Sequence, residues 1–200
     1  MFTSRPAILQ VIPRLEEGGA ERTTIEIAEA LVKAGARALV ASEGGRLEQV
    51  LAEVGGELVR LPLASKAPHR IWLNAGGIAE LAAREGVGLI HARSRAPAWS
   101  AYWATQRLQL PFVTTYHGAY AERGGLKRRY NSVMAKGDRV IANSEFTAGL
   151  ICPATASRPK NSPSSIAASI RCGSIRWQSA PSGWRPCAPG GASTTAIAWC

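Results

Sequence analysis

The first 150 residues alternate short apolar runs with longer amphipathic segments, and this alternation limits the fold classes open to the chain. The apolar runs are rich in Ile and Val and lie at Ala7–Ile12, Ala38–Ala41, Leu58–Leu63, Gly88–His91, Pro111–Tyr116 and Arg139–Ala142. Short runs without polar alternation are typical of parallel strands that are covered on both faces. They predict a sheet whose strands are separated by crossover connections.

The segments between these runs carry the spacing of amphipathic helices. Within residues 47–54 the apolar side chains follow the i, i+3, i+4, i+7 pattern of one helix face. Glycines stand where such helices should end, at Gly35, Gly55-Gly56 and Gly86. Strand and helix therefore alternate, which predicts an α/β fold with a Rossmann-like, doubly wound parallel sheet over residues 1–151. Ser144, followed by Glu145, is placed to begin a further helix.

Three aromatic residues, Trp99, Tyr102 and Trp103, have helical spacing in one of these segments. They could form a platform on which a sugar ring stacks. Helical spacing favours packing of these side chains in the core.

Residues 152–200 differ from the rest in composition. Residues 151–200 contain no Leu, Val, Phe, Met, Tyr, His, Asp or Glu, but they hold all four cysteines and three tryptophans. Large aliphatic residues are too few to form a core, so we expect this tail to be disordered. The cysteines form no CxxC pair and have no histidine near them, so a zinc site is not expected. The chain shows no signal-peptide pattern, so a secreted disulfide framework is not expected either.

The net charge of +10 is divided unevenly along the chain. Residues 151–200 have five basic and no acidic residues, and they supply half of the excess charge. No basic face with interleaved aromatic residues emerges, so binding to nucleic acid is not expected. The chain has neither a signal-peptide pattern nor an apolar run long enough to span a bilayer, which makes the cytoplasm the expected location.

Candidate ligand-binding residues follow the predicted strands, because ligands of doubly wound sheets bind at the carboxyl ends of the strands. Gly18-Gly19 opens a helix after the first strand, where free N–H groups and the helix dipole attract an anion. The spacing is not GxGxxG, and no acidic residue ends the second predicted strand, which disfavours a nicotinamide-dependent oxidoreductase. The glycine pair is equally consistent with an ordinary strand-to-helix turn.

Two histidines end strands on the same edge. His117 ends a buried strand and precedes Gly118, and His91 ends the strand before it. Such a histidine could contact a sugar hydroxyl or carry a proton, or it could be structural. Arg93 is a candidate phosphate ligand or a solvated residue.

A basic stretch that includes Arg123 and Lys127 suits an anionic acceptor, such as a phosphorylated sugar or a lipid headgroup. A solvated loop is an equally plausible interpretation of this stretch.

Five segments in this order resemble the N-terminal half of the GT-B glycosyltransferases of the large retaining family 4. They are Leu9-Gln10-Val11-Ile12-Pro13, Gly18-Gly19-Ala20-Glu21-Arg22, His91-Ala92-Arg93-Ser94, Thr114-Thr115-Tyr116-His117-Gly118 and Asp138-Arg139-Val140-Ile141-Ala142-Asn143-Ser144-Glu145. The resemblance covers nearly all of residues 6–151.

The resemblance implies transfer of a sugar from a nucleotide-sugar to an acceptor, without a metal ion or other cofactor. It implies that Gly18 and Gly19 approach the donor phosphates, and that His117 lies near the reacting sugar as the catalytic candidate. The acceptor-side candidates are His91, Arg93, Ser94, Gly118, Arg123 and Lys127. The implied acceptor is a surface-glycan or lipopolysaccharide-type molecule, with peripheral contact at the inner membrane face.

In that family a second domain binds the nucleotide and carries paired glutamates, and residues 152–200 resemble no such domain. Their composition is typical of GC-rich codons read out of frame, so we expect a frameshift near codons 150–152, inside the predicted helix. An evolved low-complexity tail is the alternative. Without the donor domain we expect this chain to be inactive alone, although it is hexosyltransferase-like. A non-catalytic α/β binding module is the alternative function.

Overall fold

The computed structural model describes residues 5–118, 125–143, 147 and 198–199. Six parallel strands form the sheet, and a two-residue strand pairs antiparallel at its edge, in the order β3-β2-β1-β4-β5-β6-β7. The strands are β1 (Ala7–Val11), β2 (Arg37–Ser42), β3 (Glu57–Arg60), β4 (Val87–Ala92), β5 (Phe112–Tyr116), β6 (Arg139–Ala142) and β7 (Ala198–Trp199). This confirms the predicted Rossmann-like parallel sheet. The predicted helix at Ser144 and nearly all of the predicted disordered tail lie outside the described residues.

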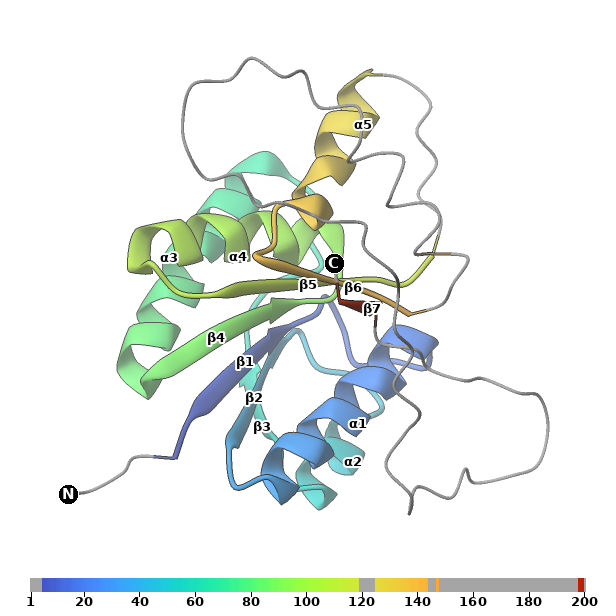
Figure 1. Cartoon of the computed structure of the whole chain (residues 1–200), viewed down its shortest axis with the longest axis vertical. Helices are drawn as coiled ribbons and strands as arrows, with labels where there is room; N and C mark the ends of the chain where they lie inside the picture. Colours follow the sequence, from blue (N-terminus) through green and yellow to red (C-terminus); the bar gives the residue numbers. More distant parts are fainter. Residues whose placement is uncertain (1–4, 119–124, 144–146, 148–197, 200) are drawn as a thin grey trace.

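Helices cover both faces of the sheet (Figure 1). They are α1 (Gly19–Lys33), α2 (Glu48–Glu53), α3 (Pro68–Glu85), α4 (Arg95–Leu108) and α5 (Gly125–Asn131), followed by a 3₁₀ turn at Ser132–Ala135. One core lies between the sheet and α1 and α2, and the other lies beneath α3 and α4. The side chains of a central strand alternate between these cores: in β2, Ala38 and Val40 belong to the first core, and Leu39 and Ala41 belong to the second.

The helix ends confirm the predicted stops. Gly35 and Gly55 follow α1 and α2 with φ of 83° and 82°, and Gly86 ends α3 in the left-handed conformation. A residue without a Cβ adopts this conformation at little cost, and it closes the last helical turn. Pro68 begins α3 at a position where no intrahelical N–H is needed.

The aromatic residues of α4 divide between the core and the surface. Trp99 and Tyr102 pack against the core, as their spacing predicts. Trp103 is 39% exposed, so the prediction of core packing was wrong for this residue. Its position on the helix places it beside α3 at the rim of the interhelical contact. No described helix combines the length and the apolar character that crossing a membrane requires.

Candidate functional site

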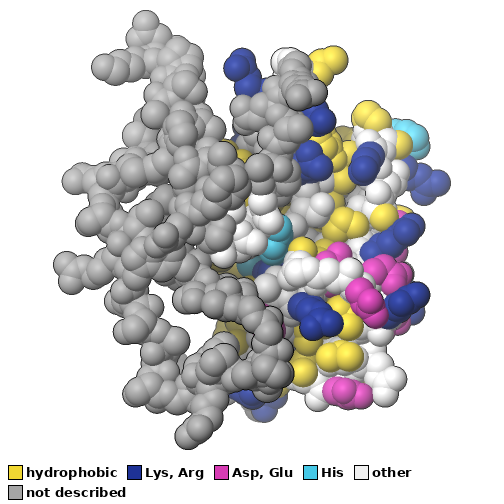
Figure 2. All heavy atoms as spheres, turned by 90° about the vertical axis from the view of Figure 1, so that its right-hand side faces the viewer, with side chains coloured by type: hydrophobic (Ala, Val, Ile, Leu, Met, Phe, Trp, Pro, Cys, Tyr) yellow, Lys and Arg dark blue, Asp and Glu magenta, His cyan; other side chains and the backbone are white. Residues whose placement is uncertain are grey.

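The carboxyl ends of the strands gather the predicted site residues at one edge of the sheet. The strands run toward the right-hand side of Figure 1, and Figure 2 looks onto that side. The loop after β1 leads to Gly18 and Gly19, the segment after β4 contains Arg93 and Ser94, and His117 follows β5. β1, β4 and β5 are neighbours in the sheet, so these segments lie next to one another.

The N-terminus of α1 is open at this edge. Gly18 is the N-cap residue and no side chain caps the helix, so the first N–H groups lack the usual side-chain acceptor. A Cβ on Gly18 would stand 2.3 Å from Oε2 of Glu21, the end of a flexible side chain that lies beside the helix start. Apart from its chain neighbours and the backbone of α1 itself, no described atom lies within 4 Å of where a Cβ on Gly19 would be. The backbone is therefore approachable here, at the positive end of the helix dipole.

Arg93 lies beneath the helix start and is only 2% exposed. Its Nη1 donates to Oε1 of Gln10 on β1 at 3.4 Å, and its Nη2 donates to Oγ1 of Thr23 on α1. Gln10 in turn donates to the carbonyl oxygen of Thr24 at 3.0 Å. The guanidinium thus joins β1 to the first turns of α1.

The charge of Arg93 is poorly compensated. None of the ion pairs among the described residues includes Arg93, and its Nε has no hydrogen-bond partner among them. Burial lowers the pKa of Arg93 to about 10. The negative charges of Glu26 and Glu21 raise this pKa, but their effect is smaller than that of burial. A buried cation without a carboxylate partner is unfavourable, which points to an anionic ligand at this position.

The two histidines occupy different depths of the same edge. His91 is 5% exposed within β4, and its Nε2 forms a hydrogen bond of 2.7 Å with Oγ1 of Thr115 on β5. His117 is partly exposed beyond β5, yet its Nε2 is buried and has no partner among the described residues. An unpartnered polar atom at a strand end is available to a ligand hydroxyl.

Both imidazoles are neutral at physiological pH. Burial, together with the charges of Arg93 and His117, lowers the pKa of His91 to about 3. Burial and Arg93 lower the pKa of His117 to about 4. A neutral imidazole can donate or accept one hydrogen bond at each nitrogen, so His117 can contact a sugar hydroxyl without carrying charge.

The remaining predicted residues are spread around this edge. Ser94 is the partly exposed N-cap residue of α4, and Gly118 directly follows His117 with φ of 159°. Lys127 is exposed on α5. Arg123 lies outside the described residues. The structure thus brings the glycine pair, Arg93 and His117 to one edge.

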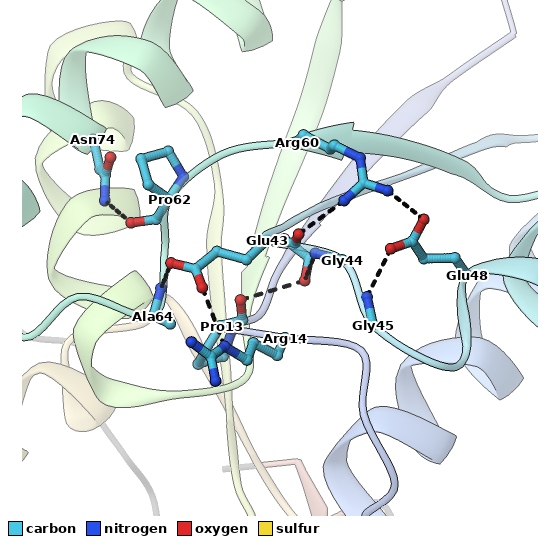
Figure 3. A network of polar contacts seen from close by, with 11 residues as sticks. Pro13, Arg14, Glu43, Gly44, Gly45, Glu48, Arg60, Pro62, Ala64 and Asn74 are labelled. Atoms are coloured by element: carbon cyan, nitrogen blue, oxygen red, sulfur yellow. Dashed lines mark hydrogen bonds and ion pairs between the residues drawn. The ribbon is translucent and has the colours of Figure 1, made fainter.

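Sequence reasoning missed a network of polar contacts beside the site (Figure 3). β2 ends one residue later than predicted, at Ser42, and is followed directly by the carboxylate of Glu43. That carboxylate accepts hydrogen bonds from Nε of Arg14 at 3.1 Å and from the backbone N–H of Ala64 at 3.1 Å. Both oxygens are therefore used to join the loops after β1 and β3, not to meet a ribose.

Arg60 extends the same network. It donates to the carbonyl oxygen of Glu43 at 3.0 Å and to Oε2 of Glu48 at 2.6 Å. The other oxygen of Glu48 accepts from the N–H of Gly45 at 2.7 Å. A Cβ on Gly45 would stand 2.5 Å from the backbone oxygen of Leu15, so the two loops touch there. The hydrogen-bond partners in this network come from separate loops, so no local sequence pattern predicts the network.

Replacing Glu43 with Gln is expected to lower the free energy of unfolding by about 1 kcal/mol, because an amide cannot accept both bonds as a carboxylate does. Chemical denaturation measures this difference, and Glu53→Gln on the exposed side of α2 is the matched control. Equal stability of the Glu43 and Glu53 variants would contradict the role of the network.

Comparisons with known proteins agree with this architecture. The sequence profile of Glycosyltransferase Family 4 matches residues 17–158. A crystal structure of a glycosyltransferase from Rickettsia africae ESF-5 is 41% identical, with a TM-score of 0.64 over 74% of this chain and 39% of that chain. No curated protein matches the chain.

Two more distant structures show the same fold. Alr3699/HepE from Anabaena, in complex with UDP and glucose, is 20% identical, with a TM-score of 0.58 over 74% of this chain and 40% of that chain. Sucrose-phosphate synthase from Thermosynechococcus elongatus is 16% identical, with a TM-score of 0.59 over 74% of this chain and 45% of that chain. The chain thus spans well under half the length of each of these proteins and corresponds to the N-terminal half of the GT-B fold.

Proposed function

Because this chain belongs to Glycosyltransferase Family 4, we propose that its carboxyl edge is the acceptor-side wall of a sugar-transfer site. The donor is a nucleotide-sugar, as suggested by the UDP bound to the Anabaena relative. The acceptor is an anionic glycan of the surface-glycan or lipopolysaccharide type. In the reaction the bond between the anomeric carbon and the diphosphate breaks, the oxygen of an acceptor hydroxyl bonds to that carbon with retention of configuration, and the hydroxyl proton passes to the departing nucleoside diphosphate.

The observation that carries this proposal is that Arg93 and His117 lie at the same edge of the sheet. The charge of Arg93 is poorly compensated, and the Nε2 of the neutral His117 has no partner among the described residues. Arg93 and the N-terminus of α1 place positive charge at this edge, beside the carboxylate of Glu21, and this positive charge favours the diphosphate that develops negative charge as it leaves. His117 presents an unpartnered Nε2 at the same edge, suited to a hydroxyl of the transferred sugar.

Each predicted residue has a role in this proposal. Gly18 and Gly19 meet the donor phosphates, and His117 contacts the reacting sugar. His91 and Arg93 act from beneath the surface, because both side chains are almost fully buried. Ser94, Gly118, Arg123 and Lys127 contact the acceptor. No group of three or more potential metal ligands occurs in the described part of the chain.

We further propose that this polypeptide does not catalyse transfer alone. The composition of residues 152–200 supports an out-of-frame tail, since it has no acidic residue and its large aliphatic residues are only four isoleucines. Translation of the downstream DNA in the other frames tests this directly. A Gly-rich α/β continuation with paired glutamates is expected, and its absence would favour an evolved tail.

A chimera tests the transferase proposal. Residues 1–143 of this chain would be joined to the donor half of the Rickettsia africae glycosyltransferase, its 41% identical relative. We expect the chimera to release nucleoside diphosphate from a nucleotide-sugar when acceptor glycan is present. His117→Ala should lower this rate by about a hundredfold or more, because a contact with the reacting sugar is lost. His69→Ala, on the exposed first turn of α3, is the matched control.

UDP binding by the chimera separates the alternative, because the donor half supplies the nucleotide-binding domain. Titration of UDP into the chimera should perturb the backbone resonances of Gly18 and Gly19. A non-catalytic binding module would bind its ligand equally well but give a folded chimera with no turnover. UDP titration that leaves Gly18 and Gly19 unperturbed would count against the donor-phosphate site itself.

A further inference from the structure

A fully buried amide interrupts the apolar layer between the sheet and α1. Gln10 is the fourth residue of β1, and its side chain is 0% exposed. In the register of the sheet it lies beside Val40 of β2, which belongs to the core beneath α1 and α2. An amide at such a position is unfavourable unless its polar atoms form hydrogen bonds. The contacts of Gln10 must therefore account for its presence in this layer.

Both ends of the amide have a partner. Nε2 of Gln10 donates to the carbonyl oxygen of Thr24 in α1 at 3.0 Å, and Oε1 accepts from Nη1 of Arg93 at 3.4 Å. A guanidinium only donates and a carbonyl oxygen only accepts, so the side chain between them needs one acceptor and one donor. Glutamine meets this requirement. An ionised glutamate has no donor for Thr24, and an apolar side chain has neither group.

Thr23 holds the guanidinium of Arg93 from the other side. Its Oγ1 accepts from Nη2 of Arg93, and it donates to the carbonyl oxygen of Gly19 in the first turn of α1 at 2.9 Å. The two Nη atoms are thus tied to β1 and to α1, whereas the buried Nε has no partner among the described residues. The guanidinium therefore has a defined position near the start of α1, where the donor phosphates are proposed to bind.

The amide also leaves the charge of Arg93 uncompensated. A carboxylate in its place would lie at hydrogen-bond distance from Nη1 and would form a buried ion pair with the guanidinium. The acidic side chains that act on Arg93 are Glu26 and Glu21 of α1, and no ion pair within the described part of the chain joins either of them to it. An anion at this edge therefore meets a cation that no carboxylate has neutralised.

We propose that Gln10 is a positioning residue for the donor diphosphate. It acts through Arg93, because it fixes the guanidinium near the start of α1 and, being neutral, leaves the positive charge available to phosphate oxygens. This proposal rests on the sugar-transfer site proposed above and adds a residue that the site does not yet include. A purely structural role, in which the amide only joins β1 to α1, is the competing explanation.

Binding of UDP and of uridine by the chimera tests the proposal, because the two ligands differ only by the diphosphate. Gln10→Glu should weaken UDP binding by about tenfold or more, since the added carboxylate neutralises Arg93 and repels phosphate. Uridine, which contacts only the donor half, should bind as before. Gln106→Glu makes the same change of charge at an exposed position of α4 and is the matched control. Its affinity for UDP should equal that of the unmodified chimera.

A second variant removes the other contact of the guanidinium without adding charge. Thr23→Val should weaken UDP binding by about three- to tenfold, because Nη2 of Arg93 loses its acceptor. Thr23→Ser keeps the hydroxyl and should restore most of this affinity. If Gln10→Glu does not fold, as judged by circular dichroism, the comparison of Thr23→Val with Thr23→Ser decides the question.

Two results would overturn the proposal. One is a folded Gln10→Glu chimera, or a Thr23→Val chimera, that binds UDP as tightly as the unmodified chimera. The other is an equal weakening of UDP and uridine binding, which would show that Gln10 serves the fold alone. Both readouts measure binding without turnover. A chimera that binds UDP with the expected dependence on Gln10 but transfers no sugar would therefore contradict the sugar-transfer proposal and leave this one standing.

Discussion

Lowering the pH from 7.5 to 5 is expected to remove about 3 kcal/mol from the free energy of unfolding, through His91 and His117. Both have folded-state pKa values, of about 3 and about 4, below the usual value of 6.5. Below pH 6.5 the unfolded chain binds protons that the folded protein does not. Stability therefore rises with pH across this window and is lost on acidification.

The size of the effect follows from burial. One proton taken up only by the unfolded state between pH 6.5 and 5 corresponds to about 2 kcal/mol. That value applies to His91, which is almost fully buried. His117 is partly exposed, so solvent screening reduces its share to about 1 kcal/mol.

Urea denaturation at several pH values measures this dependence. His117→Gln should reduce the loss of unfolding free energy between pH 7.5 and 5 by about 1 kcal/mol. His91→Gln should reduce it by about 2 kcal/mol. His69→Gln, at an exposed position, is the matched control for loss of an imidazole. A stability that stays constant between pH 7.5 and 5 would show that the histidines are not held in their neutral forms.

The sheet could be predicted because each strand and helix has a local signal. Apolar runs, helical spacing and glycines at helix ends each act within a few residues, and they determine the alternation that leads to a parallel sheet. The predicted strand at Arg139–Ala142 agrees with β6 to the residue. Helical spacing gave a wrong prediction for Trp103. The spacing shows which face of the helix a residue lies on, but not whether the neighbouring helix covers that residue completely.

The site could be predicted only in part. Its location followed from topology, since β1, β4 and β5 bring Gly18, Arg93 and His117 to one edge. The contacts of each side chain did not follow, because they depend on residues far away in the sequence. Arg93 meets Gln10 and Thr23, which lie 83 and 70 positions earlier. Its burial beneath α1 therefore emerged only from the structure.

Replacing Arg93 with Met is expected to raise the free energy of unfolding by about 1 to 3 kcal/mol while weakening anion binding. Lowering the pKa of Arg93 to about 10 from its usual 12.5 corresponds to roughly 3 kcal/mol of unfavourable charge burial. Met fills a similar volume without charge, and such replacements of buried ions are often neutral or stabilising. Losing the bonds to Gln10 and Thr23 offsets part of the gain.

The same substitution should alter the pH dependence, because Arg93 lowers the pKa of both His91 and His117. Without this cation the two pKa values rise, and the total loss of stability on acidification becomes smaller, mainly below pH 5, because burial still keeps both values low. Arg107→Met, at an exposed arginine, should change neither quantity by more than about 0.5 kcal/mol. UDP titration of both variants, each made in the chimera that carries a donor half, completes the test. A destabilised Arg93→Met protein that still binds UDP normally would mean that Arg93 serves the fold alone. A more stable protein that no longer binds UDP would mean that this buried cation is retained for its ligand at the expense of stability.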